Sequence, residues 1–211
     1  MYRSSILLIL IFNIGFGQKT EKFSDWKNTV KPNLYKIDVI QNNKPKEAIV
    51  TFDLFKKAKN KWIRIQNLSF KKQVQSSLSV TTDEDLNNDG YNDLKISYAQ
   101  AGRGSNSIEK LFIFNPKLYK FIEIVNSQEY PNLRYNQKRD CINSYSFYGG
   151  NSTYFLRMDK NKLKTFARVD YYNDTVTSYH IKNGQDILLK KIPYKSEDAA
   201  VFFTDFDPIE E

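Results

Sequence analysis

Short segments of alternating or β-branched residues, each ended by turn-forming residues, recur about every ten positions from Leu34 onward. Successive side chains of a β-strand point to opposite faces, so this period of two is typical of half-buried strands. The segments Val176 to Ile181 and Asp186 to Ile192 are joined through Asn183-Gly184, a dipeptide that favours a tight hairpin. Helical periodicity is scarce. We therefore predict an all-β fold, an antiparallel meander that forms a twisted sheet, a sandwich or a propeller-like arrangement.

One domain accounts for most of the chain. A length of 211 residues suits a single domain with an N-terminal extension, and 40% hydrophobic residues are enough to fill one core. We divide the sequence into a signal peptide (1–17), an N-terminal segment (18–33), a single all-β domain (34–192) and an acidic, aromatic tail (193–211). Thr20 to Asn28 is compatible with a short helix around Phe23 and Trp26. The tail would either dock as an edge strand or stay mobile.

The first residues predict export. Arg3 precedes a nearly continuous apolar run from Ile6 to Phe16, and Gly15 and Gly17 place small residues at the −3 and −1 positions of a cleavage site before Gln18. The run is shorter than the roughly 20 residues that a membrane-spanning helix needs. We expect a cleaved secretory signal, no retained membrane anchor and a periplasmic or secreted protein.

Charge and cysteine content narrow the class of protein further. The formal net charge is +8, but acidic residues are interleaved with the basic ones along the sequence, which favours a diffuse basic surface and no nucleic-acid partner. Cys141 is the only cysteine, so no intramolecular disulfide can form. The simplest interpretation of this thiol is a buried, inert side chain.

One stretch has the donor pattern of a calcium loop. Oxygen-bearing side chains fall at its positions one, three, five and nine, and glycine falls at position six, in the sequence Asp85-Leu-Asn-Asn-Asp-Gly-Tyr-Asn-Asp93. Calcium takes six to eight oxygen ligands. The predicted donors are the side chains of Asp85, Asn87, Asp89 and Asp93 and the backbone carbonyl of Tyr91. Three crowded carboxylates would repel one another without a cation, although a solvated turn is the alternative interpretation.

The loop differs from an EF-hand. Position twelve, where an EF-hand carries glutamate, is Ile96. Asp93 closes the loop instead, and Leu94 begins a strand at once. This shorter form resembles the calcium loops of FG-GAP and VCBS-type β proteins.

The features that follow the loop come in a distinctive order. They are the strand Leu94 to Tyr98, the Gly102/Gly104 connection, Leu111-Phe-Ile-Phe-Asn-Pro-Lys117, the Phe121 strand and the segment Ser144 to Gly150. Together they resemble a family of bacterial periplasmic calcium-binding proteins that includes lysozyme-inhibitor-like and immunity proteins. The likeness spans roughly Val80 to Asp170, and its specific parts are the calcium loop and the Phe-Asn-Pro-Lys turn. It implies a calcium-stabilised, all-β fold whose loops plug the active-site cleft of a cell-wall hydrolase.

Two glycine-hinged loops are candidates for contact with such a partner. A lysozyme-type cleft is built around carboxylates, so an inhibitor needs hydrogen-bond donors on loops that enter it. The candidates are Arg103, Ser105, Asn106 and Ser107 in the first loop, and Asn151, Ser152 and Tyr154 beside Gly149-Gly150 in the second. Solvated hairpin tips are the alternative for both loops.

Catalytic signatures are missing from the sequence. His180 is the only histidine, no G-x-S-x-G elbow occurs, and one His with one Cys does not make a zinc site. We therefore expect a binding protein rather than an enzyme. The first hypothesis is an inhibitor or immunity protein for a lysozyme-like peptidoglycan hydrolase. The alternative is a calcium-stabilised structural or adhesion module that binds glycan or protein at the cell surface.

Overall fold

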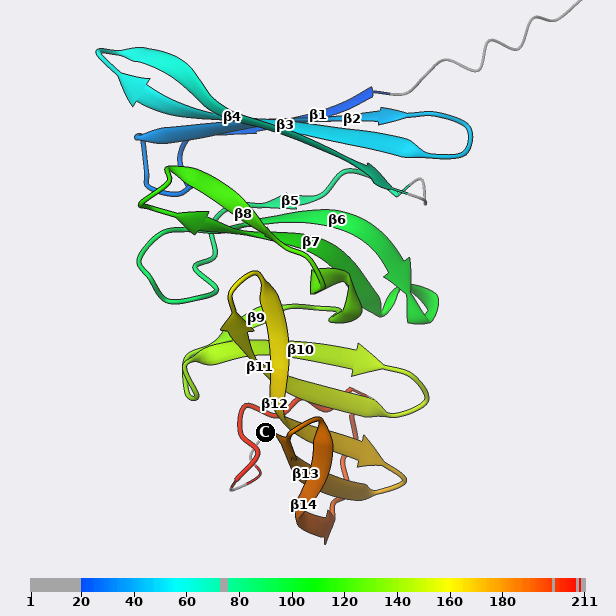
Figure 1. The fold of residues 1–211 in the computed structure, drawn as a ribbon. Coiled ribbons are helices and arrows are strands. Elements are labelled where there is room, and N and C mark those ends of the chain that lie inside the picture. The colour runs from blue at the N-terminus through cyan, green and yellow to red at the C-terminus, as the bar shows by residue number, and fades with distance from the viewer. Residues whose placement is uncertain (1–19, 73–75, 199, 208, 210–211) are drawn as a thin grey trace, which may run out of the picture.

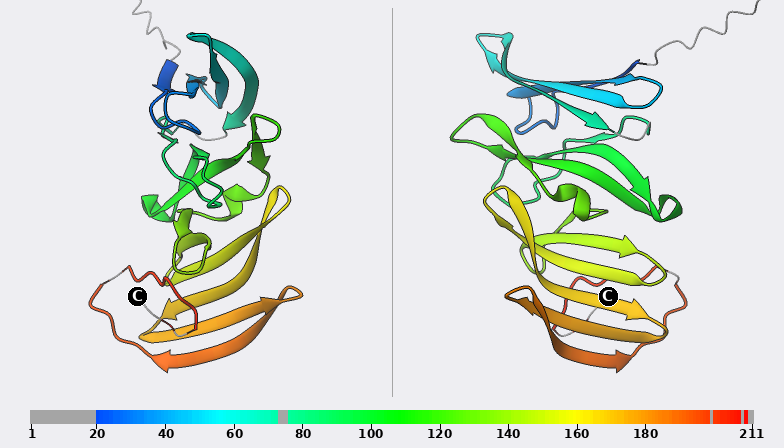
Figure 2. Two further views of the ribbon diagram at one scale, coloured as in Figure 1. Left: turned by 90° about the vertical axis from the view of Figure 1, so that its left-hand side faces the viewer. Right: turned by 45° about the vertical axis from the view of Figure 1, so that its right-hand side comes forward.

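The computed structural model describes residues 20–72, 76–198, 200–207 and 209, and it confirms the all-β fold class. Its strands form three antiparallel sheets that stack one above another in a column (Figures 1 and 2). The described residues contain no α-helix, and none of their helices is long and apolar enough to cross a membrane. The predicted signal peptide lies outside the described residues.

The first two sheets are four-stranded meanders, and the third has six strands. The first sheet contains β1 (Thr20–Asp25), β2 (Tyr35–Asn43), β3 (Ala48–Ala58) and β4 (Lys61–Lys72). The second contains β5 (Val80–Thr81), β6 (Leu94–Ala101), β7 (Asn106–Asn115) and β8 (Lys120–Ile124). The third contains β9 (Arg134–Asn136), β10 (Cys141–Phe147), β11 (Asn151–Asp159), β12 (Lys162–Tyr172), β13 (Thr175–Lys182) and β14 (Gln185–Pro193). The 3-10 turns η1 (Gly102–Gly104) and η2 (Ser127–Glu129) complete the elements.

The short helix considered for Thr20 to Asn28 is wrong, because this segment begins with strand β1. Residues 20–25 alternate between exposed and half-buried positions, the period of a strand, and they pair antiparallel with β2 in the register Phe23↔Val39. Phe23 packs against the core of the first two sheets. Pairing with β2 therefore overrides the weak helical pattern.

Aromatic side chains hold the first two sheets together. Phe52 of β3 meets Phe112 of β7 with ring centroids 5.2 Å apart, and Tyr35 of β2 meets Phe114 of β7 at the same separation, both edge to face. All four rings are buried in one hydrophobic cluster. Edge-to-face pairs add to the free energy that the buried apolar area already contributes.

A second, aliphatic cluster joins the second sheet to the third. Leu111 and Ile124 from the second sheet pack with Ile142 and Leu156 from the third. Four-stranded sheets of this kind have two faces, and stacking buries an apolar face that neither sheet could cover alone.

After Pro193, which ends β14, the described residues of the tail form no edge strand and dock on the third sheet. These residues, 194–198, 200–207 and 209, fold back over the sheet. Val201, Phe203 and Phe206 are buried against Phe155 and Val169. Burial alternates from Val201 to Asp205, but these residues form no strand ladder, so Phe203 and Phe206 fill a face of the sheet instead of extending its edge.

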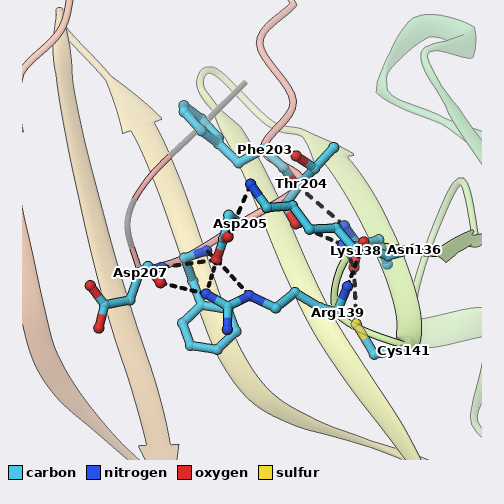
Figure 3. Close-up of polar contacts among 10 residues, drawn as sticks. Asn136, Lys138, Arg139, Cys141, Phe203, Thr204, Asp205 and Asp207 are labelled. Atoms are coloured by element: carbon cyan, nitrogen blue, oxygen red, sulfur yellow. Dashed lines mark hydrogen bonds and ion pairs between the residues drawn. The ribbon is translucent and has the colours of Figure 1, made fainter.

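Polar contacts fix the tail to the turn between β9 and β10 (Figure 3). Arg139 Nε donates to Asp205 Oδ1 at 2.6 Å, and Lys138 lies 3.3 Å from the other carboxylate oxygen. Burial acts to raise the pKa of Asp205, yet these hydrogen bonds and those from the backbone of Phe206 and Asp207 outweigh it and keep the pKa below its usual range. The tail is therefore an integral part of the third sheet's core.

Replacing Phe203 with Ala should lower the free energy of unfolding by about 3 kcal/mol or more, because the ring is fully buried. Phe202 is the matched control, since it is exposed and its ring forms T-shaped pairs with Tyr145 and Phe147. Phe202→Ala should cost about 1 kcal/mol. Urea denaturation measures both values, and equal costs would contradict the docked tail.

A buried lysine lies between the first two sheets. Lys72 Nζ donates to Gln41 Oε1 at 2.9 Å and to Ser97 Oγ at 3.3 Å, and the side chain is shielded from solvent. Burial lowers its pKa to about 8, although the charge of Glu21 acts in the opposite direction. The folded protein thus binds fewer protons at this position than the unfolded chain does above pH 8.

Because the folded protein binds fewer protons at Lys72 than the unfolded chain does, its free energy of unfolding rises as the pH rises from about 8 toward the pKa of an unfolded lysine. Lys72→Met removes the titrating group. Between pH 7 and pH 10 the unfolding free energy of the wild type should rise, relative to that of the Lys72→Met variant, by on the order of 2 kcal/mol. Urea titrations of both proteins measure it, and a pH-independent difference would contradict a lowered pKa.

Candidate calcium loop and recognition loops

Asp93 closes the loop Asp85–Asp93 between β5 and β6, which we call the acidic loop. Its Oδ2 accepts the backbone N–H of Leu86 at 2.8 Å, and its Oδ1 accepts the backbone N–H of Phe114 in β7 at 3.0 Å. The side chain is buried. One carboxylate thus ties the start of the loop to its end and fastens both to the second sheet.

The other carboxylates shape the turn inside the loop. Asp85 accepts the backbone N–H groups of Asp89 at 3.2 Å and of Gly90 at 2.7 Å, and Asp89 accepts that of Tyr91 at 3.0 Å. Gly90 has φ +82°, a left-handed conformation that favours glycine. Position six of the loop therefore needs the glycine that the sequence pattern singled out.

Asn87 leaves one oxygen without a partner. Its Nδ2 donates to Asp89 Oδ2 at 2.9 Å, whereas its Oδ1 is shielded from solvent and has no hydrogen bond within the described structure. Buried polar atoms are nearly always satisfied, so this oxygen is open to a water molecule or a ligand. An oxygen of this kind, next to a carboxylate, is suited to a cation.

The loop also holds a carboxyl group out of water. Burial raises the pKa of Asp93 to about 7, the charges of Asp89 and Asp85 add to this effect, and the hydrogen bonds from Phe114 and Leu86 oppose it. An ionised Asp93 is therefore costly unless a positive charge accompanies it.

Calcium binding to the loop remains a prediction. Among the described residues, no three His, Cys, Asp or Glu side chains gather into a metal-binding group, since the loop's carboxylates accept its own backbone N–H groups. The donor types still fit the ion, because carboxylate and amide oxygens are the ligands that calcium takes, and the free Asn87 oxygen is one of them. The fifth predicted ligand belongs to Tyr91, whose ring packs 5.6 Å from that of Phe114.

The loop also lies at the junction of all three sheets. Asn92 donates from its backbone to Val30 O at 3.0 Å and from its side chain to Asn28 O at 2.7 Å, both in the β1–β2 connection. Asn88 Nδ2 donates to Asp140 Oδ1 at 3.3 Å, in the β9–β10 turn of the third sheet. The ligand spacing marks neither Asn88 nor Asn92, and no sequence signal reveals these long-range partners.

The β6–β7 and β10–β11 connections carry the predicted partner residues, and we call them the recognition loops. They lie side by side. Asn106 Nδ2 donates to Phe147 O, and Phe147 N donates to Asn106 Oδ1, both at 3.0 Å. A Cβ on Gly102 would lie 2.6 Å from Asn106 Nδ2, so this close approach requires glycine. The β6–β7 and β10–β11 connections, some 40 residues apart in sequence, thus share one edge of the molecule (Figure 1).

The structure divides the predicted partner residues into two groups. Arg103, with φ 56°, and Ser105 are exposed, and Ser107 is partly buried. Asn106 and Asn151 are buried, so they belong to the frame that holds the loops rather than to the exposed surface.

Ser152 and Tyr154, the remaining candidates, line a cavity of about 360 Å³ beside the β10–β11 loop. Within it, Asp170 accepts from Ser152 Oγ at 2.7 Å and from Arg168 Nε at 3.0 Å. Strongly exposed Tyr148 and Tyr172 also line this cavity. Strand alternation alone would place Arg168 and Asp170 on one face of β12, but only the fold brings them to the loop.

Comparison with known proteins gives a fold and no family. No family model matches the chain, and no curated protein matches it. A solved structure of a Xanthomonas type IV secretion system related protein has a similar fold, with a TM-score of 0.50 and 11% sequence identity. The alignment covers 80% of this chain and 93% of that chain. At this identity the likeness concerns the fold alone.

Replacing Asp89 with Ala should abolish the response of the melting temperature to calcium. Binding to the folded state alone at 100 times the Kd stabilises it by about 2.7 kcal/mol, or roughly 5 to 10 °C for a chain of this size. Asp83→Ala is the matched control, because Asp83 is an exposed carboxylate just outside the loop. Differential scanning calorimetry with EDTA and with calcium measures the response. An unchanged calcium response in the Asp89 variant would contradict calcium binding by the acidic loop.

Proposed function

We propose that this protein is an exported, calcium-binding inhibitor or immunity protein that blocks the active-site cleft of a lysozyme-like peptidoglycan hydrolase. The observation that carries the proposal is the pair of adjacent loops fastened by Asn106 and Phe147. A single flexible tip would lose much binding energy on ordering, whereas two loops tied to each other are already ordered.

The exposed groups of these loops suit a cleft lined with carboxylates. Arg103 offers a guanidinium with several N–H donors, and Ser105 adds a hydroxyl on the same exposed turn. Tyr148 projects from the neighbouring loop as a large amphipathic side chain of the type that is enriched in protein interfaces. Together they provide a charged anchor and an aromatic anchor on one edge.

Calcium has a supporting role in this proposal. The acidic loop and the recognition loops lie at opposite ends of β6 and β7 (Figure 1). Strand β6 starts directly after Asp93 and ends directly before Gly102. An ion bound in the loop would fix the near end of the two strands that carry the first recognition loop.

The solved structure with a similar fold is that of a Xanthomonas protein related to a type IV secretion system, which is consistent with a role at the cell envelope.

The inhibitor proposal predicts loss of muramidase activity on a peptidoglycan substrate when the exported protein is added in stoichiometric amounts to a lysozyme-like hydrolase from the same envelope. Arg103→Ala should weaken inhibition at least about tenfold, since a hydrogen bond to a charged group is worth roughly 1.5 to 3 kcal/mol. Lys182→Ala, which removes an exposed cation from the β13–β14 turn, is the matched control and should inhibit like the wild type. Undiminished hydrolysis with the wild type, or equal inhibition by the Arg103 variant, would count against the proposal.

A glycan-binding module is the second candidate function. It is favoured by the cavity of about 360 Å³ between exposed Tyr148 and Tyr172, which contains the Arg168 and Asp170 pair. Aromatic faces with a few charged donors and acceptors are a common lining of small-ligand sites. Retention of the wild type on peptidoglycan, and its loss in Tyr172→Ala with hydrolase inhibition intact, would support this candidate.

A further inference from the structure

Exposed apolar side chains gather at one edge of the first two sheets. They lie in or beside three connections, β1–β2, β3–β4 and β7–β8, which share the same edge in Figures 1 and 2. The exposed fractions are 55% for Leu34, 52% for Ile63, 56% for Leu118 and 51% for Tyr119. Apolar groups that cluster in this way mark an interaction site more often than single exposed ones do.

Direct contacts show that these residues form one patch. The backbone N–H of Lys57 donates to Leu34 O at 2.9 Å, and Lys56 pairs with Ile63 across the β3–β4 ladder. Lys56 Nζ lies 3.9 Å from the ring centroid of Tyr119 in the β7–β8 turn. We call this patch, with the lysines described next, the hairpin-tip surface.

The hairpin-tip surface is strongly basic. Six lysines occupy the two hairpin ends: Lys56, Lys57, Lys59, Lys61, Lys117 and Lys120. The sequence contains no Asp or Glu in residues 26–37, 54–82 or 111–122. The basic residues look evenly spread along the chain, but the fold brings the hairpin ends within these segments to one edge, where they lie next to the acidic loop that Asn92 joins to the β1–β2 connection.

We propose that the hairpin-tip surface docks the protein on an anionic phospholipid bilayer. Lysines near an anionic leaflet gain attraction, and exposed Leu, Ile and Tyr side chains gain from burial at the boundary between headgroups and acyl chains. Turn tips from two sheets reach a flat surface together. A soluble polyanion would satisfy the lysines yet leave Leu34, Ile63 and Leu118 in water, so the apolar half of the patch favours the bilayer.

This orientation has a structural consequence. The recognition loops lie at the opposite ends of β6 and β7 from the β7–β8 turn (Figure 1). A protein held by its hairpin tips would present those loops away from the lipid. The proposal itself stands on the patch alone and does not depend on hydrolase inhibition.

Vesicle flotation tests the proposal with the chain from Gln18 onward, which lacks the predicted signal peptide. Vesicles of phosphatidylcholine with about 30% phosphatidylglycerol should carry the protein, and pure phosphatidylcholine vesicles should carry at least tenfold less. Leu118→Ser combined with Ile63→Ser should reduce binding about tenfold at low salt. Lys57→Gln and Lys117→Gln should each reduce it about fivefold.

Matched control substitutions are available on β14, which carries the same residue types at the far end of the column. Leu188→Ser and Lys190→Gln alter an exposed leucine and an exposed lysine, and both should leave flotation unchanged. Thermal melting verifies that each variant is folded, and Leu118→Ser alone serves if the double variant is not. Equal flotation with neutral vesicles, or wild-type binding by the folded Leu118→Ser protein, would overturn the proposal. So would binding to a soluble polyanion as tight as to vesicles and insensitive to the apolar substitutions.

Discussion

The two hydrogen bonds that Asp93 accepts connect the acidic loop to the rest of the structure. One comes from Leu86 at the start of the loop and the other from Phe114 in β7, so a single buried carboxylate sets where β6 begins. Because β6 runs directly to the Gly102 connection, its position determines where the first recognition loop lies. The same burial makes the ionised carboxylate costly, which is the physical reason for expecting a cation beside it.

Strand pairing holds each of the three sheets together, but it does not hold the sheets to one another. Aromatic pairs such as Phe52 with Phe112 join the first two sheets, and the folded-back tail covers the face of the third. Between these apolar layers, side-chain amides make specific long-range bonds. Asn92 reaches the β1–β2 connection, and Asn106 joins the two recognition loops. Amides suit this role because each carries both a donor and an acceptor for backbone groups.

Local patterns predicted the strands but not their assembly. The alternating side chains and the Asn183-Gly184 turn predicted the β13–β14 hairpin. Gly90 has the left-handed conformation that the calcium-loop pattern predicted at its sixth position. The helix considered near Phe23 was wrong because pairing with β2 outweighs local preference. The docked tail, the Asn106 contact with Phe147 and the gathering of lysines at the hairpin tips all depend on partners 40 or more residues away. No local period encodes such contacts.

We propose that the acidic loop closes around a calcium ion, and a crystal structure from crystals grown in millimolar calcium would show that ion. It should lie 2.3–2.6 Å from Asn87 Oδ1 and from carboxylate oxygens of the loop. A well-ordered loop in which Asn87 Oδ1 instead accepts a hydrogen bond, with no ion beside Asp93, would contradict it.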